Sequence, residues 1–295
     1  MIPFEDLTPE EIEEASIQEL EAGRLPVRAQ QRLAMINTDH AFTSDLTINE
    51  HHAIRSVGFS PVGQVMGSCV YRVATVTSWS CGFSGWGYNS AAPVRESDVL
   101  RDGMLEARRL AVGRMRQECV GLGGDGVVAV TLTIVPFPAG GLEFQVVGTA
   151  VRADGKVRAK KPFMSDLTGQ DFAKLMTAGW LPCGLVFGLS VGIRHDDWRT
   201  QNQQGSWSNT EITGQTQLVQ ATRHMARKRL REEAAHVGGT GVVIRNSELR
   251  VWHQSCSNGG EHQHDHLAEA VYIGTAIAQY RRTTPAAPLP MVRLR

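Results

Sequence analysis

The sequence has few of the features that identify secreted, membrane or disulfide-rich proteins. Its five cysteines are an odd number and include no CxxC pair, which argues against a disulfide framework and against a zinc ribbon. No stretch approaches the roughly 20 consecutive apolar residues of a membrane-spanning helix. The acidic start, MIPFEDLTPEEIEE, lacks the positive charges and apolar core of a secretion signal. We therefore expect a cytoplasmic protein with no membrane span.

Net charge is also absent, because 30 basic side chains balance 30 acidic ones. A neutral chain creates no long-range field that attracts nucleic acid or anionic membranes, so no nucleic-acid partner is expected. The sequence contains no HExxH and no GxSxG motif, and its Gly-rich GGDGVV segment follows a predicted helix where a phosphate loop would precede one. These absences favour a protein that is not an enzyme.

What the sequence does contain is an internal repeat. FTSDLT, residues 42–47, recurs as FMSDLT, residues 163–168, at an offset of 121. The same offset relates GFSPVGQVMG to GWLPCGLVFG. Further along, GGDGVV matches GGTGVV at an offset of 115, and the two GTA triplets lie 126 residues apart. The rise in offset from 115 to 126 places eleven extra residues of the second copy between GGTGVV and GTA.

Each copy predicts the same order of elements. Thr47 with Glu50, and Thr168 with Asp171, are the N-cap and N3 residues expected at the start of a short helix. A Val- and Gly-rich strand, a long helix and a two-stranded hairpin follow. We therefore predict an α+β fold in which a helix packs on an antiparallel sheet twice. The apolar stripe of the long helix consists of Ala111, Met115, Cys119 and Leu122 in one copy and of Ala226, Leu230, Ala234 and Val237 in the other.

These elements divide the chain into five predicted segments. Two helices separated by Gly23-Arg-Leu-Pro26 form an N-terminal helical arm, and a Pro-rich tail ends the chain. We call the first repeated copy the first half and the second repeated copy the second half. The segments are the arm at residues 1–41, the first half at 42–152, a basic linker at 153–162, the second half at 163–282 and the tail at 283–295.

The sequence contains three features in a fixed order: the pattern G-[FW]-x-P-x-G-x-V-x-G, then a helix ending in GGxGVV, and then GTA. In this order of features it resembles the YbjQ-like family, which is also described as heavy-metal-binding. The resemblance covers residues 42–152 and 163–280, as two tandem copies. It implies a small α+β domain that forms homo-oligomeric rings and has no settled activity, and it supplies no set of metal ligands. The resemblance implies rings that are typically pentamers of single-domain members. Because pairs of domains cannot tile one ring of five, the tandem chain is expected to form either an even ring or two stacked rings with one copy in each.

One stretch of the second half, HQSCSNGGEHQHDHLAEA, predicts a metal site. His262, His264 and His266 alternate at the start of a predicted strand and would share one face, and His253 or Cys256 across the hairpin would complete a tetrahedral set. The implied cofactor is zinc or another divalent transition metal. The alternative is an exposed polar hairpin tip, since SNGG is typical of turns.

Three tryptophans predict an oligomer or partner surface. Trp79 and Trp86 lie in the Gly- and Ser-rich segment SWSCGFSGWGYNS, and Trp207 lies in its counterpart, RTQNQQGSWSNTE. Exposed aromatic residues anchor protein interfaces, here with the chain itself or with an unknown protein partner. The alternative is that Trp86 and Trp207 cover the sheet or a subunit contact.

The remaining candidates favour structural roles. Cys119 and Cys183 occupy apolar positions, so buried thiols are expected there. The basic helix ATRHMARKRLREE is expected to present a solvated face that pairs with acids of neighbouring subunits. The sequence thus predicts a non-enzymatic, ring-forming scaffold or binding protein. The alternatives are a metal-binding or metal-sensing protein that uses the His-rich hairpin, and an enzyme with an unrecognised site at a subunit interface.

Overall fold

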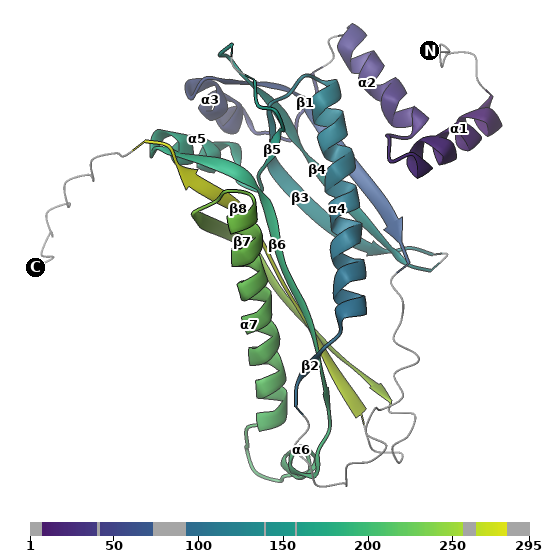
Figure 1. The fold of residues 1–295 in the computed structure, drawn as a ribbon, viewed down its shortest axis with the longest axis vertical. Coiled ribbons are helices and arrows are strands. Elements are labelled where there is room, and N and C mark those ends of the chain that lie inside the picture. Colours follow the sequence, from purple (N-terminus) through teal and green to yellow (C-terminus); the bar gives the residue numbers. More distant parts are fainter. Residues whose placement is uncertain are drawn as a thin grey trace, which may run out of the picture.

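The protein has the predicted α+β fold, with two four-stranded sheets and a long helix packed on each (Figure 1). The computed structural model describes residues 8–39, 42–72, 93–138, 140–156, 158–255 and 264–281. None of the described helices combines the length and the apolar character needed to cross a membrane.

The N-terminal arm consists of the two predicted helices, α1 (Pro9–Glu21) and α2 (Val27–Asp39). Thr8 and Glu11 exchange hydrogen bonds in a capping box, which determines where α1 begins. The arm is attached to the long helix of the first half, where Arg32 of α2 forms an ion pair with the buried Glu118.

The first half begins with the short helix expected after Thr47, whose hydroxyl and the Glu50 carboxylate form a capping box. Its sheet has the strand order β1-β4-β3-β5, and the last of these strands comes from the second half and pairs in parallel. The first-half elements are α3 (Ile48–Ser56), β1 (Phe59–Tyr71), β2 (Arg95–Glu96), α4 (Asp98–Gly121), β3 (Gly126–Pro136) and β4 (Leu142–Ala153).

The second half repeats this order and receives β2 from the first half at the edge of its sheet, which has the order β2-β6-β8-β7. The exchange of β2 and β5 between the halves was not predicted, and neither was the short helix α6. The second-half elements are β5 (Phe163–Met164), α5 (Gly169–Thr177), β6 (Trp180–His195), α6 (Trp198–Gln204), α7 (Thr213–His236), β7 (Gly241–Ser255) and β8 (His264–Gln279).

Corresponding positions of the two halves have the same local geometry. Helices α4 and α7 each contain 24 residues. The pairing of β1 with β4 shifts register at Pro61/Gly63, and that of β6 with β8 shifts at Pro182/Gly184. These shifts lie at the positions that the offset of 121 relates. The two sheets therefore bend at corresponding places.

Two glycines let the long helices approach their sheets closely. A Cβ atom on Gly67 of β1 would lie 2.1 Å from the carbonyl oxygen of Ala111 in α4. A Cβ atom on Gly188 of β6 would lie 2.3 Å from the carbonyl oxygen of Ala226 in α7. Any side chain at either position would push the helix away, so glycine determines the helix-to-sheet distance in both halves.

The predicted apolar stripes are buried, with one exception. Leu122 is only 5% exposed because it joins the cluster that contains Leu33 of α2. Its counterpart Val237 is 38% exposed, since no helix in the described part of the second half covers it as α2 covers Leu122. The sequence prediction was wrong for Val237.

Helix α4 packs against both sheets, and strands β6 and β8 run between α7 and α4 (Figure 1). Phe187, Leu189 and Val191 point away from α7 and join the hydrophobic cluster of α4. Val186 points the other way and packs with Ala226 of α7. The sheet of the second half is therefore covered by a long helix on each face.

Candidate functional site

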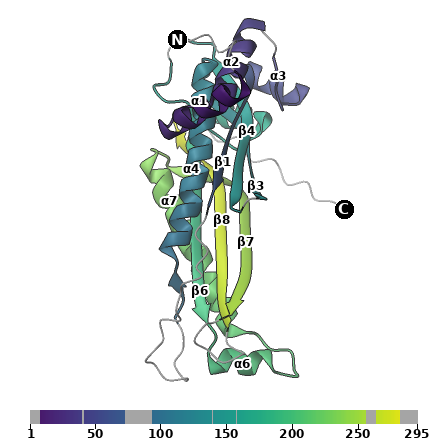
Figure 2. The same cartoon turned by 90° about the vertical axis from the view of Figure 1, so that its right-hand side faces the viewer.

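The His-rich hairpin of the second half adds length to its sheet. β8 pairs with β7 as far as Ser255 and with β6 as far as His195, beyond the end of the corresponding pairing in the first half. The lengthened strands run toward the end of the molecule where α6 lies (Figure 2). Part of the eleven-residue excess therefore extends the strands.

The structure brings two of the five predicted metal ligands together. His253 of β7 and His266 of β8 are direct partners across the ladder, with ring centroids 6.5 Å apart. His264 is the first residue of β8, while Cys256 and His262 lie outside the described residues. Within the described part of the chain, no three His, Cys, Asp or Glu side chains come together as a metal site.

Two carboxylates contact histidines at this end of the sheet. The Nε2 atom of His266 lies 3.1 Å from the carboxylate of Asp196, and the Nδ1 atom of His195 lies 2.7 Å from that of Asp265. A carboxylate in this position holds an imidazole in one tautomer and orientation. Sequence reasoning missed both aspartates, because their pairing depends on the strand register between β6 and β8.

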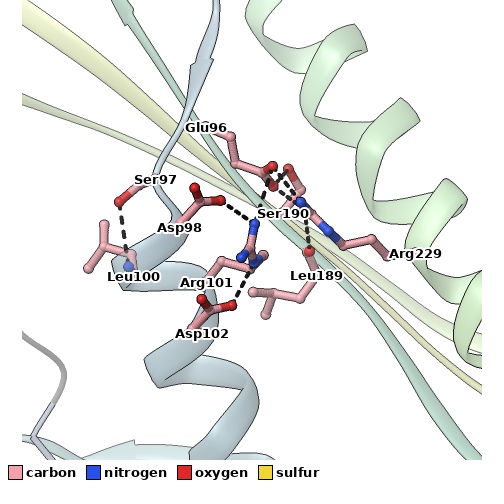
Figure 3. A network of polar contacts seen from close by, with 9 residues as sticks. All are labelled: Glu96, Ser97, Asp98, Leu100, Arg101, Asp102, Leu189, Ser190 and Arg229. Carbon is pink, nitrogen blue, oxygen red and sulfur yellow. Dashed lines mark hydrogen bonds and ion pairs between the residues drawn. The ribbon is translucent and has the colours of Figure 1, made fainter.

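A second polar site joins the two halves at the edge of β6 (Figure 3). Glu96 of β2 accepts a hydrogen bond of 2.7 Å from the Ser190 hydroxyl, and Arg229 of α7 binds both of its carboxylate oxygens. Arg229 also donates to the carbonyl oxygen of Leu189 at 3.2 Å. The basic helix was expected to pair with acids of a neighbouring subunit. For Arg229, the acid lies in the same chain.

Electrostatics keep Glu96 ionised. Burial raises the pKa of this carboxyl, but the hydrogen bonds from Arg229 and Ser190 and the nearby Arg229 and Arg101 charges outweigh burial and hold the pKa below its ordinary value. Arg101 lies 3.5 Å from Glu96 and also contacts Asp98 and Asp102 of its own helix. The carboxylate therefore holds β2, β6 and α7 together near neutral pH.

A buried ion pair forms a second polar contact between the halves. Arg108 of α4 and Glu269 of β8 are 2% and 3% exposed, and their charged atoms lie 3.5 Å apart. Arg108 also donates to the carbonyl oxygen of Met104 at 2.9 Å and lies over the Phe144 ring. Burial lowers the pKa of Arg108, and the charge of Glu269 opposes this shift. Removing either partner would leave a buried charge without compensation.

The predicted aromatic surface is only partly described. Trp79 and Trp86 lie outside the described residues. Trp207 is fully exposed and follows α6, so within the chain it does not cover the sheet. It stands three residues before Thr210, in the segment that leads into α7.

The described cysteines are free thiols without activation. Cys119 is fully buried, and burial raises its pKa to about 12, which keeps the thiol protonated and unreactive near neutral pH. Cys69 is buried as well, and Cys183 is partly buried against the α7 cluster. The predicted buried thiol is therefore confirmed for Cys119, whereas Cys183 is only partly buried.

Two comparisons identify related proteins. Residues 95–154 match a YbjQ family model described as "Putative heavy-metal-binding", so the first half contains a YbjQ-like domain. This matched segment has no histidine, and its single cysteine is the buried Cys119. The Encapsulin nanocompartment protein Rv1762c of Mycobacterium tuberculosis is 34% identical over 231 residues, which cover 76% of this chain and 83% of the relative. No solved structure matches the chain at a significant level.

Proposed function

This chain belongs to the family of the encapsulin nanocompartment protein of Mycobacterium tuberculosis, and we propose that it assembles with copies of itself into a non-enzymatic shell or scaffold. The observation that carries this proposal is the 34% identity, which extends over 83% of that relative. The relative is named for a compartment, and a compartment is built from repeated contacts between chains. Such contacts need surfaces that a single chain leaves open.

Two described surfaces support self-assembly. Strand β7 is the outer strand of its sheet, and an uncovered strand edge presents backbone groups that can pair with another chain. The face of the first sheet that points away from α4 is also accessible, with Val70 50% exposed. A second copy of the chain would cover both surfaces.

We infer further that the second half is itself a YbjQ-like domain, so that the chain is a tandem duplication with the halves at residues 42–152 and 163–282. The matched register shifts of the two sheets and the equal lengths of α4 and α7 support this inference. A tandem chain of this kind is compatible with an even ring or with two stacked rings that each contain one half.

Mass measurement tests the proposed function. Native mass spectrometry and light scattering of the purified full chain should give a multiple of 32.3 kDa, and electron microscopy should show closed particles or rings of uniform size. A preparation that stays at 32.3 kDa across the accessible concentration range would contradict self-assembly.

A second candidate function is the binding of zinc or another divalent transition metal by the His-rich hairpin. The observation that favours it is the cross-strand pair of His253 and His266, with Asp196 oriented on His266 as a supporting carboxylate. We propose that His262, His264 and Cys256 supply further ligands. Two facing imidazoles with added His or Cys donors suit a tetrahedral zinc ion.

Elemental analysis of the protein purified without a histidine tag tests this candidate, with about one metal ion per chain expected. Replacing His262, His264 and His266 together by alanine should remove the metal. Replacing two exposed histidines elsewhere, His52 and His236, is the matched control and should leave it in place. Metal retained by the triple variant would overturn the assignment.

A further inference from the structure

We propose that neighbouring chains join head to tail by repeating, between chains, the contact that joins the two halves within one chain. This inference rests on the proposed self-assembly and specifies its interface. Within the chain, β2 and α4 of the first half cover the edge and one face of the second sheet. Between chains, the segment before α7 and α7 itself would cover the edge and open face of the next chain's first sheet.

The first support is an ion-pair site with one partner missing. By the offset of 115, Glu96 corresponds to Glu211, and Arg229 corresponds to Arg114. Arg114 donates to the carbonyl oxygen of Ser68, as Arg229 donates to that of Leu189, so the guanidinium already occupies the matching position. In the described part of the chain, no carboxylate lies within ion-pair distance of Arg114. Its equivalent partner would be Glu211 of a neighbouring chain.

Glu211 is available for this contact. Its side chain is exposed, and it accepts a hydrogen bond of 2.8 Å from the Thr216 hydroxyl in the first turn of α7. Thr216 stands at the position that corresponds to Arg101, which lies beside Glu96 in the other half. The fully exposed Trp207 lies four residues before Glu211 and would enter the same contact.

The second support is a second Arg–Glu pair at corresponding positions. Arg108 and Glu269 form the buried pair within the chain. Arg223 on α7 corresponds to Arg108 by the offset of 115, and Glu143 on β4 corresponds to Glu269 by the offset of 126. Arg223 is exposed. Glu143 precedes the buried Phe144, whose side chain joins the α4 cluster, so Glu143 faces the open side of the first sheet. Both members of this pair, Arg223 and Glu143, therefore lie where a neighbouring chain could contact them.

The third support is a strand edge with a groove beside it. Within the chain, β5 pairs with β3 at Gly126 and Val127, and Met164 is buried in the α4 cluster. The corresponding positions, Gly241 and Val242 of β7, border an open groove of about 570 Å³ between β7 and α7. The segment that corresponds to β5 is residues 42–43, where Phe42 is 49% exposed. In the proposed contact, this segment of the next chain pairs with β7.

A groove also exists where the neighbour's Glu211 would enter. It has a volume of about 560 Å³ and lies beside β1, lined on one side by Ser68 and Arg114 and on the other by Ala29 and Arg32 of the N-terminal arm. The arm therefore forms the outer wall of the site that receives the segment before α7. The arm is held there by the ion pair of Arg32 with Glu118, one helical turn from Arg114.

The three contacts all run in one direction, from the second half of one chain to the first half of the next. A head-to-tail contact of this kind generates a closed ring or an open filament. Because contacts within and between chains alternate, a closed ring contains an even number of halves. Salt should weaken the contacts between chains, because their ion pairs are more exposed than those within the chain.

Charge reversal in the full chain tests this interface. Glu211→Arg and Arg114→Glu should each weaken self-association by roughly 100-fold, because each places like charges opposite one another. The double variant, Glu211→Arg with Arg114→Glu, should restore the wild-type mass. Glu232→Arg, on an exposed acid of α7, is the matched control and should leave the mass unchanged.

The outcomes separate the interface from the proposed function. If the wild-type chain is monomeric, self-assembly itself fails. If the wild-type chain assembles and the single variants keep its mass, or the double variant stays dissociated, the interface assigned here is wrong. Should a single variant fail to fold, as judged by circular dichroism, the pair Arg223→Glu and Glu143→Arg provides the same swap at an independent contact.

Discussion

The sheets of the two halves have the same order of their main strands. They differ in the face that points away from the long helix of the same half. The face of the second sheet that points away from α7 is largely apolar and is buried against α4, through Phe187, Leu189 and Val271. At the corresponding positions, the first sheet has Met66, Ser68 and Gln145, which are all partly exposed. The comparison shows that the same framework can bury a face within a chain or leave it more polar and partly exposed.

The edges of the sheets also differ in whether another strand of the chain covers them. β2 pairs with β6 over two residues, and β5 pairs with β3 over two residues, so each half covers part of an edge of the other. β1 and β7 are the long outer strands of the two sheets, and no described strand pairs with their outer edges. The covered edges lie where the halves meet, and the open edges lie on opposite halves. The proposed head-to-tail contact would therefore use one edge from each half.

The largest expected difference between the halves concerns Arg108 and its counterpart Arg223. Replacing Arg108 by alanine leaves Glu269 buried without its partner, so the free energy of unfolding should fall by about 3–5 kcal/mol. Replacing the exposed Arg223 by alanine should change it by less than about 0.5 kcal/mol. Urea unfolding followed by circular dichroism, under conditions where the chain is monomeric, measures both. Equal losses would contradict the difference in burial.

The glycines under the long helices should respond alike in the two halves. Gly67→Ala and Gly188→Ala each force a Cβ atom into a helix backbone, and overpacking of this kind costs about 1–3 kcal/mol of folding free energy. Gly113→Ala is the control, because a Cβ atom there meets nothing within 4 Å and alanine favours the helix by up to about 1 kcal/mol. Thermal and urea unfolding of the three variants would reveal unequal costs if the halves pack differently.

The smallest effect is expected from Glu96→Gln, and it should depend on pH. The pKa of Glu96 is held below its ordinary value, so its ionised form stabilises the fold above about pH 4.5, and this contribution is lost as the pH falls through the lowered pKa. The variant should be less stable by about 1 kcal/mol at pH 7 and equal to the wild-type chain in acid. Unfolding measured from pH 7 to pH 3 gives the difference, and a constant difference would exclude the carboxylate charge as its cause.

Most elements could be predicted because their signals are local. The hydroxyl of Thr47 and the carboxylate of Glu50 lie within one helical turn, and the stripe that begins at Ala111 follows the helical period. The two-residue strands β2 and β5 carry no such pattern, since alternation cannot be recognised over two residues. The contact of His266 with Asp196 was missed for a related reason, because it depends on how β6 aligns with β8.

Local patterns in the chain were enough to determine the α+β class, the N-terminal helices and the repeated order of short helix, strand, long helix and hairpin, because capping and periodicity act between neighbouring residues. Only the tertiary structure decided which surfaces are covered. The placement of α4 between the sheets brings Glu96 to Arg229, which lies 133 residues away in the sequence. It also buries the second sheet on both faces, while the first sheet keeps one face open. Contacts at that separation depend on how whole elements pack, which no single segment of the sequence specifies.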